Sequence, residues 1–209
     1  MLLGFLELYK VTGDEFLLDY CKAYLDHHLA AGYKMGTSDT CAPAGVAIWL
    51  YHFTENTAYR GVAEGALTYL YEEASRTEEG GISHLGIVDI VTIWVDSLFM
   101  FGNVFMGWYE TTGDTDSLAA MGEQFAICTT LLQSDGGFYA HAHQWIIEQT
   151  PDVYWSRGNG WVAVAGASYL RLLAMRQEND VVALVALQKL VDAAIATQDP
   201  ETGLWWTIL

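Results

Sequence analysis

Basic side chains are scarce in this sequence of 209 residues, which has 9 lysines and arginines against 26 aspartates and glutamates and a net charge of −17. Nucleic acids and acidic membrane surfaces are bound by clustered lysine and arginine, so the sequence predicts neither a nucleic-acid nor a membrane partner. A small anionic substrate is compatible with this charge if a few cations gather at its site.

Cysteine pairs, long apolar runs and metal motifs are also lacking. Cys21, Cys41 and Cys128 form no CxxC or zinc pattern, which indicates reduced core thiols and favours a cytoplasmic protein. No apolar run approaches the roughly 20 residues that span a bilayer. Neither HExxH, nor a nucleophile elbow, nor a phosphate-binding glycine loop occurs, so the sequence predicts no metal and no cofactor.

A short motif recurs along the chain, with tyrosine and threonine followed by Gly-Asp or Glu-Asn, at residues 9–14, 51–56 and 109–114. Glycine or asparagine can take the left-handed conformation that ends one helix, and the next residue can cap the following helix. The motif threonines are 42 and 58 residues apart, a spacing that is typical of repeated helical pairs.

Two kinds of helix alternate between these turns. Helices with one polar face are predicted over residues 14–29, 58–74, 115–132 and 181–197, and helices that are apolar nearly all round over residues 44–51, 94–109 and 160–175. Exposed helices alternating with buried ones make two concentric rings. The prediction is an all-α fold, an (α/α) toroid, with about four hairpins present in a single domain over residues 1–209. This domain is expected to be truncated at both ends, or completed by a second copy in a homo-oligomer.

In a toroid of hairpins the inner helices all begin at one rim, so the groups before them should converge. Residues 37–40, 93–100 and 155–161 occupy this position in the repeat. Asp39 and Asp96 are 57 residues apart, and Asp96 and Asn159 are 63 apart, which matches the repeat.

Asp96 is the sharpest candidate, because its carboxyl stands in an apolar stretch, WVDSLFM, over residues 94–100. Burial there favours the neutral acid, which suits general acid chemistry. A helix N-cap is the alternative, since Asp-Ser before an apolar run is a common cap. Asp39 could keep Asp96 protonated by repulsion between like charges, or could be a turn residue before Pro43.

The segment WSRGNGW, residues 155–161, is the most unusual in the chain. Arg157 offers a planar fork for a carboxylate, and Trp155 and Trp161 offer flat faces for sugar rings. The alternative is a turn that begins a helix, with Arg157 paired to a neighbouring acid. His84, His141 and His143 follow glycine turns and could each polarise a substrate, although a lone histidine is more often structural. Trp145 could line the mouth of the site.

Residues 94–100, 137–141 (GFYAH) and 155–161, in this order, resemble the unsaturated uronyl hydrolases of glycoside hydrolase families 105 and 88. The similarity runs over nearly the whole chain, to TGLW at residues 202–205. The family fold is an α/α barrel of six hairpins, and the RGNGW and GFYAH stretches favour family 105.

The resemblance implies an exo-acting hydrolase of oligosaccharides that polysaccharide lyases leave with a C4=C5 unsaturated uronic acid, here unsaturated galacturonyl-rhamnose. Asp96 would protonate C4, and its carboxylate would then activate water for attack at C5, with Asp39 assisting. The segment around Asp39 matches only loosely. The expected substrate-binding residues are His141, Arg157, Trp155, Trp161, Asn159 and Trp94.

Two other classes of function stay open on the sequence alone. A different toroid enzyme, such as an inverting glycosidase or a sugar epimerase, would act on saturated sugars; an inverting glycosidase needs two carboxyls about 6.5–9.5 Å apart. A fragment without catalysis would bind oligosaccharide and release no product.

Overall fold

The structure of the chain is a computed structural model that describes residues 1–144 and 152–209. The helices are α1 (Leu2–Thr12), α2 (Glu15–Ala30), α3 (Ser38–Thr54), α4 (Thr57–Thr68), α5 (Val95–Met100), α6 (Gly102–Thr112), α7 (Thr115–Leu132), α8 (Ser156–Met175) and α9 (Val181–Thr197). A π-helical segment, η1 (Tyr69–Glu73), continues α4, and β1 (Ile93–Trp94) pairs antiparallel with β2 (Ala142–His143). The described residues are therefore mainly helical with little sheet, as predicted.

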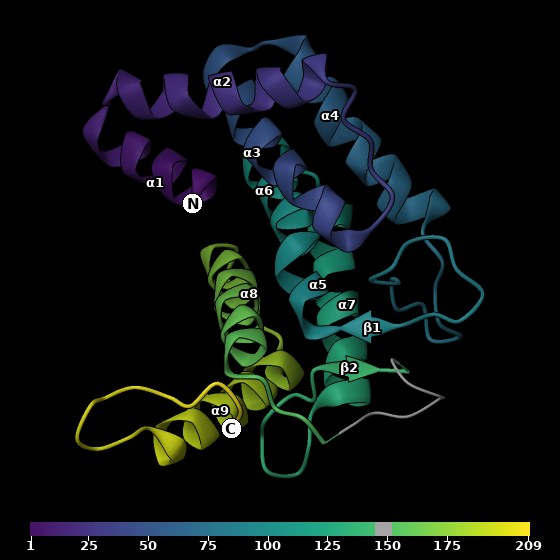
Figure 1. The fold of residues 1–209 in the computed structure, drawn as a ribbon, viewed down its shortest axis with the longest axis vertical. Coiled ribbons are helices and arrows are strands. Elements are labelled where there is room, and N and C mark those ends of the chain that lie inside the picture. The colour runs from purple at the N-terminus through teal and green to yellow at the C-terminus, as the bar shows by residue number, and fades with distance from the viewer. Residues whose placement is uncertain (145–151) are drawn as a thin grey trace.

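Consecutive helices pair into hairpins, α1 with α2, α3 with α4, α5 and α6 with α7, and α8 with α9 (Figure 1). The hairpins follow an arc from α1 at the top of Figure 1 to α9 at the bottom. Along this arc α1 packs on α3, α3 on α6, and α6 on α8. The inner and outer helices of the predicted toroid are therefore present, and four hairpins are found within the described chain.

The recurrent turns close the hairpins mostly as predicted. Gly13 and Gly113 end α1 and α6 in the left-handed conformation, with φ of 66° and 79°. In the second turn, however, Glu55 is left-handed (φ 57°), whereas Asn56 caps α4 by accepting from the amide of Ala58. The prediction that the asparagine would adopt the left-handed conformation was wrong there. Glu55 adopts it, and the side chain of Asn56 serves as the N-cap of α4.

The inner helices extend beyond their predicted bounds: α3 ends at Thr54 against the predicted 51, α6 ends at Thr112 against 109, and α8 begins at Ser156 against 160. Helix α3 begins at Ser38, well before the predicted start at residue 44, because Thr37 and Thr40 form a reciprocal capping box. Pro43 is the sixth residue of α3, so it removes the amide that would bond the carbonyl of Asp39, and its ring crowds that carbonyl. The inner helix predicted over residues 94–109 is divided at Phe101, which keeps helical dihedrals (φ −80°, ψ −25°), so that α5 and α6 form one nearly continuous inner element.

The buried apolar side chains form one continuous core that reaches from Leu6 in α1 to Leu190 in α9. All three cysteines are buried and unpaired, and burial raises the pKa of Cys41 and of Cys128 to about 12. The predicted core thiols are confirmed. Over residues 1–144 and 152–209, no helix is both long enough and apolar enough to cross a bilayer.

Candidate active site

The short sheet brings the sequence motifs together. Trp94 in β1 lies opposite Ala142 in β2, and the amide of Val95 donates to the carbonyl of His141 over 3.1 Å. Helix α8 approaches the same place through Gly158, where an added Cβ would lie 2.6 Å from Cγ2 of Val95. Only a glycine lets α8 come this close to the start of α5. The arrangement joins three motifs that are far apart in the sequence.

Asp96 lies in the first turn of α5 and is only 7% exposed. The N-cap position of α5 belongs to Trp94, so the alternative that Asp96 is a helix cap is wrong. One carboxyl oxygen of Asp96, Oδ1, is 3.6 Å from Nη2 of Arg157, and the other, Oδ2, is 3.7 Å from Nδ1 of His141. This proximity of residues 96 and 157 is what the helical repeat predicted.

The two contacts of Asp96 lie at ion-pair distances and are too long to be hydrogen bonds. Burial lowers the pKa of His141, with Asp96 opposing and Arg157 adding to this effect. A neutral imidazole and a fixed cation therefore flank the Asp96 carboxyl.

Aromatic rings build the wall around this carboxyl. The ring of His141 lies 4.8 Å from that of Trp94 and 5.3 Å from that of Trp155. The guanidinium of Arg157 stacks over Trp155 at 4.8 Å, while 58% of the side chain stays exposed. Among the described residues, Arg157 is thus the charged group next to Asp96 that faces solvent, and the ring of Trp155 supports it.

The carboxyl of Asp39 forms its ion pair with His84. Nε2 of His84 is 3.8 Å from Oδ2 of Asp39, and the His84 ring stacks on Trp94 at 4.3 Å and 6°. The side chain of Asp39 is 64% exposed. Asp39 therefore reaches the Asp96 cluster through His84 and Trp94, a link that the sequence did not predict.

Asn159 was predicted to contact substrate, but its side-chain amide bonds to backbone groups in the structure. Its side-chain oxygen accepts from the amide of Tyr139 at 2.8 Å, and its nitrogen donates to the carbonyls of Tyr139 and Trp155, each at 3.0 Å. Three bonds to backbone occupy the amide, so Asn159 fastens the GFYAH segment to the start of α8. Trp161 stacks on Phe99 at 4.1 Å and 30°, which leaves only one of its faces for a sugar.

Two neighbours of Asp96 escaped sequence reasoning as site residues. Ser97 and Gly158 lie inside the motifs, but their importance depends on contacts between elements. His84 was a candidate for contact with substrate, and the structure places it against Ser97 and Asp39. Trp145, which was expected near the mouth, lies outside the described residues.

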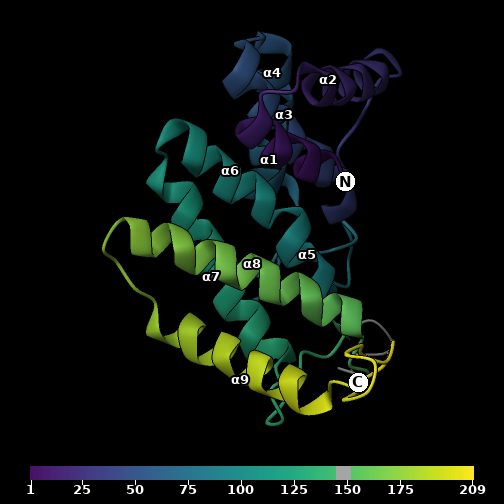
Figure 2. The same cartoon turned by 90° about the vertical axis from the view of Figure 1, so that its left-hand side faces the viewer.

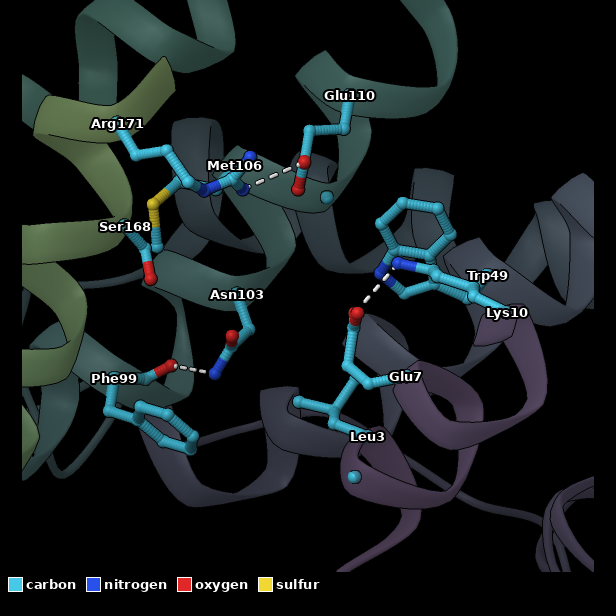
Figure 3. Close-up of a pocket in the computed structure, with 12 residues that line it drawn as sticks. Leu3, Glu7, Lys10, Trp49, Phe99, Asn103, Met106, Glu110, Ser168 and Arg171 are labelled. Atoms are coloured by element: carbon cyan, nitrogen blue, oxygen red, sulfur yellow. Dashed lines mark hydrogen bonds and ion pairs between the residues drawn. The ribbon is translucent and has the colours of Figure 1, made fainter. Parts of the chain in front are cut away.

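A cavity of about 510 Å³ lies further along the inner helices, lined from α1, α3, α6 and α8 (Figure 3). Its charged side chains neutralise one another in pairs, Arg171 with Glu110 at 2.9 Å and Lys10 with Glu7 at 2.7 Å. It therefore has no unpaired charge to attract an anionic sugar, and the rim around Asp96 is the better candidate. No group of three or more potential metal ligands occurs within the described ranges.

The chain is similar to known proteins in both sequence and fold. Residues 1–209 match the sequence model of Glycosyl Hydrolase Family 88. The chain is 25% identical to the unsaturated rhamnogalacturonyl hydrolase YesR of Bacillus subtilis (strain 168), over 99% of this chain and 61% of that protein. It therefore spans less than two thirds of the length of this curated relative.

Solved structures share the fold. A Klebsiella pneumoniae protein described as a possible member of the GH105 family superposes with a TM-score of 0.89 at 23% identity, covering 100% of this chain and 56% of that one. The unsaturated glucuronyl hydrolase of Bacillus sp. GL1 gives 0.74 at 17%, covering 98% and 57%. Through the match to its whole length, the chain belongs to glycosyl hydrolase family 88.

Proposed function

We propose that this chain carries the active site of a glycoside hydrolase that removes a C4=C5 unsaturated uronic acid from the non-reducing end of oligosaccharides. The observation that carries the proposal is the buried Asp96 carboxyl between Arg157 and His141. The name of the relative YesR supports unsaturated galacturonyl-rhamnose as the substrate.

Recognition of the substrate carboxylate depends on local charge, because the chain as a whole carries −17 and repels anions. The exposed guanidinium of Arg157 offers two parallel N–H groups to a carboxylate. His141 is held neutral by burial and adds a donor without a second positive charge. The uronate would therefore bind with its acid group at Arg157 and its ring beside Asp96.

The proposed reaction begins with the neutral acid form of Asp96, which gives its proton to C4 of the double bond. Positive charge then develops at C5 and is shared with the ring oxygen. Asp96, now a carboxylate beside Arg157, takes a proton from the water that attacks C5, and so recovers its own. The product at C5 is a hemiketal, which opens to a ketone and leaves a hemiacetal at C1. The hemiacetal then breaks down to an aldehyde and releases the remaining sugar.

This sequence of steps uses one carboxyl as acid and then as base, unlike the paired carboxyls of ordinary glycosidases. Arg157 and His141 lie 3.6 Å and 3.7 Å from the two oxygens of Asp96, so a cation and a neutral ring stand beside the carboxyl in both halves. The free face of Trp161 and the ring of Trp155 would stack against sugar rings on either side.

The test is incubation with lyase-digested rhamnogalacturonan beside lyase-digested glycosaminoglycan, with the ultraviolet absorbance of the double bond as readout. We expect the rhamnogalacturonan products to be consumed, and Asp96→Asn to slow this by at least about 10²–10⁴-fold with unchanged helicity. Glu110→Gln, in the deeper cavity, is the matched control and should stay active. Full activity of Asp96→Asn would remove Asp96 from the mechanism, and turnover of saturated sugars alone would favour an inverting glycosidase.

A further inference from the structure

His84 lies in the loop between η1 and β1, and its backbone fastens that loop to two other elements. Its amide donates to the carbonyl of Thr92 at 2.8 Å, and its carbonyl accepts from the amide of Ser38 at 3.0 Å. Ser38 is the first residue of α3, so this bond satisfies one of the free amides at the start of the helix that carries Asp39. The position of His84 is therefore fixed relative to Asp39.

The side chain of His84 is fixed as firmly. It is 5% exposed and lies flat on Trp94, with the two rings 4.3 Å apart and inclined by 6°. Nδ1 is 3.0 Å from the hydroxyl oxygen of Ser97, the residue after Asp96, and Nε2 is 3.8 Å from Oδ2 of Asp39. One ring thus touches the neighbours of both candidate carboxyls.

The chemistry of these partners assigns the tautomer of the ring. Burial lowers the pKa of His84, against the opposing effect of Asp39 and Asp96 and with a smaller lowering by His141, so the ring is neutral at pH 7. With its single proton on Nε2, the ring would turn that proton towards the Asp39 carboxylate, which can only accept. Nδ1 would then accept from the Ser97 hydroxyl.

We propose that His84 is a positioning residue of this active site, whose ring links Ser97 to Asp39 and so sets where the Asp39 carboxylate stands relative to Asp96. The inference rests on the proposed function and adds a residue to it. Both nitrogens of the ring face polar partners, and these partners lie on two different elements, Ser97 in α5 and Asp39 in α3. The 3.8 Å contact is long for a hydrogen bond, and such contacts often tighten once substrate is bound.

Three substitutions of His84 separate the two contacts. His84→Phe keeps the ring on Trp94 and removes both nitrogens, His84→Gln can place a donor near the Nε2 position, and His84→Asn can place an acceptor near the Nδ1 position. We expect kcat to fall about 100-fold in His84→Phe, as a misplaced catalytic group predicts, with KM changed less than about threefold. His84→Gln should recover part of kcat, and His84→Asn should recover less. His52→Gln, at an exposed histidine near the end of α3, is the control.

Combining Asp39→Asn with His84→Phe tests whether His84 acts through Asp39. We expect the double variant Asp39→Asn, His84→Phe to be no slower than Asp39→Asn alone, because residues that act as a unit are not additive. Losses that multiply, or a rise in KM with unchanged kcat, would overturn the proposal.

A spectroscopic readout keeps this test distinct from that of the proposed function. Long-range proton–nitrogen NMR of the histidine rings, assigned with His84→Phe, should show His84 neutral at pH 7 with its proton on Nε2. A proton on Nδ1, or a charged ring, would overturn the proposal even in an active enzyme. A wild type that leaves unsaturated uronides intact would instead refute the proposed function, and with it the catalytic consequence of His84.

Discussion

Gly158→Ala tests the close approach of α8 to α5, on which the site depends. A Cβ at residue 158 would lie 2.6 Å from Cγ2 of Val95, and 3.8 Å from both Oδ2 of Asp96 and Nδ1 of His141. The contact with Val95 is about 0.9–1.4 Å closer than the roughly 3.5–4.0 Å at which carbon atoms rest. Because Val95 is fully buried, we expect helix α8 to move away from α5 and to carry Arg157 with it.

The loss of stability caused by the clash can be separated from the effect of alanine on the stability of the helix itself. Overpacking of this kind costs about 1–3 kcal/mol in stability. Alanine in place of glycine inside a helix gains about 0.5–1 kcal/mol. Gly160 lies two residues further along α8, and a Cβ there would meet nothing within 4 Å. Gly160→Ala should thus be slightly stabilised, and the two variants should differ by the clash alone, about 1–3 kcal/mol.

The assay pairs urea denaturation with the double-bond absorbance assay on the two variants. We expect Gly158→Ala to lose about 100-fold in kcat/KM through the displacement of Arg157 from Asp96, while Gly160→Ala keeps wild-type activity. Val95→Ala in the Gly158→Ala background removes the clashing methyl and should recover part of both stability and activity. Equal stability and activity of the two alanine variants would refute the packing argument.

Four further predictions concern the surroundings of the site. Arg157→Lys should raise KM about 10-fold with less effect on kcat, because an ammonium lacks the planar fork; an unchanged KM would contradict this. Asn159→Ala should lower the free energy of unfolding by about 1–3 kcal/mol in denaturation, since it strands the buried amide and carbonyl of Tyr139, and a neutral effect would count against its structural role. The lowered pKa values of His84 and His141 mean that the unfolded chain binds more protons below the ordinary value of 6.5, so the melting temperature should fall as pH drops from about 7 to about 5, less so in His84→Phe. Exposed apolar side chains of α9 support the predicted self-association, which static light scattering would show as a dimer and a monomer would contradict.

Much of the fold could be predicted because the hairpin repeat is local in the sequence. Gly13 and Gly113 mark turns whose geometry only glycine adopts easily, and the outer helices over residues 115–132 and 181–197 begin and end as predicted. The start of α3 was missed because its capping box uses Thr40 where glutamate is usual.

The site was predictable to the extent that it follows from the repeat. The motifs around Asp96 and Arg157 were expected to meet, and their side chains are 3.6 Å apart. The roles of Asn159 and His84 were not predictable, because they depend on hydrogen bonds to other elements. Figure 2 shows a further case, in which the C-terminal segment returns to the start of α8 and Ile208 pairs with Trp155. No local sequence pattern predicts such a contact.

Proton transfer to carbon is the central claim of the proposed mechanism, and reaction in heavy water tests it most directly. The product would be reduced with borohydride at early times, to limit exchange of hydrogen for deuterium at the carbon beside the new ketone. Its mass would then be measured by mass spectrometry. The mechanism with Asp96 as acid predicts deuterium bound to carbon at C4 in the released uronic acid. Release of the sugar without carbon-bound deuterium, with the double bond intact in the product, would contradict it.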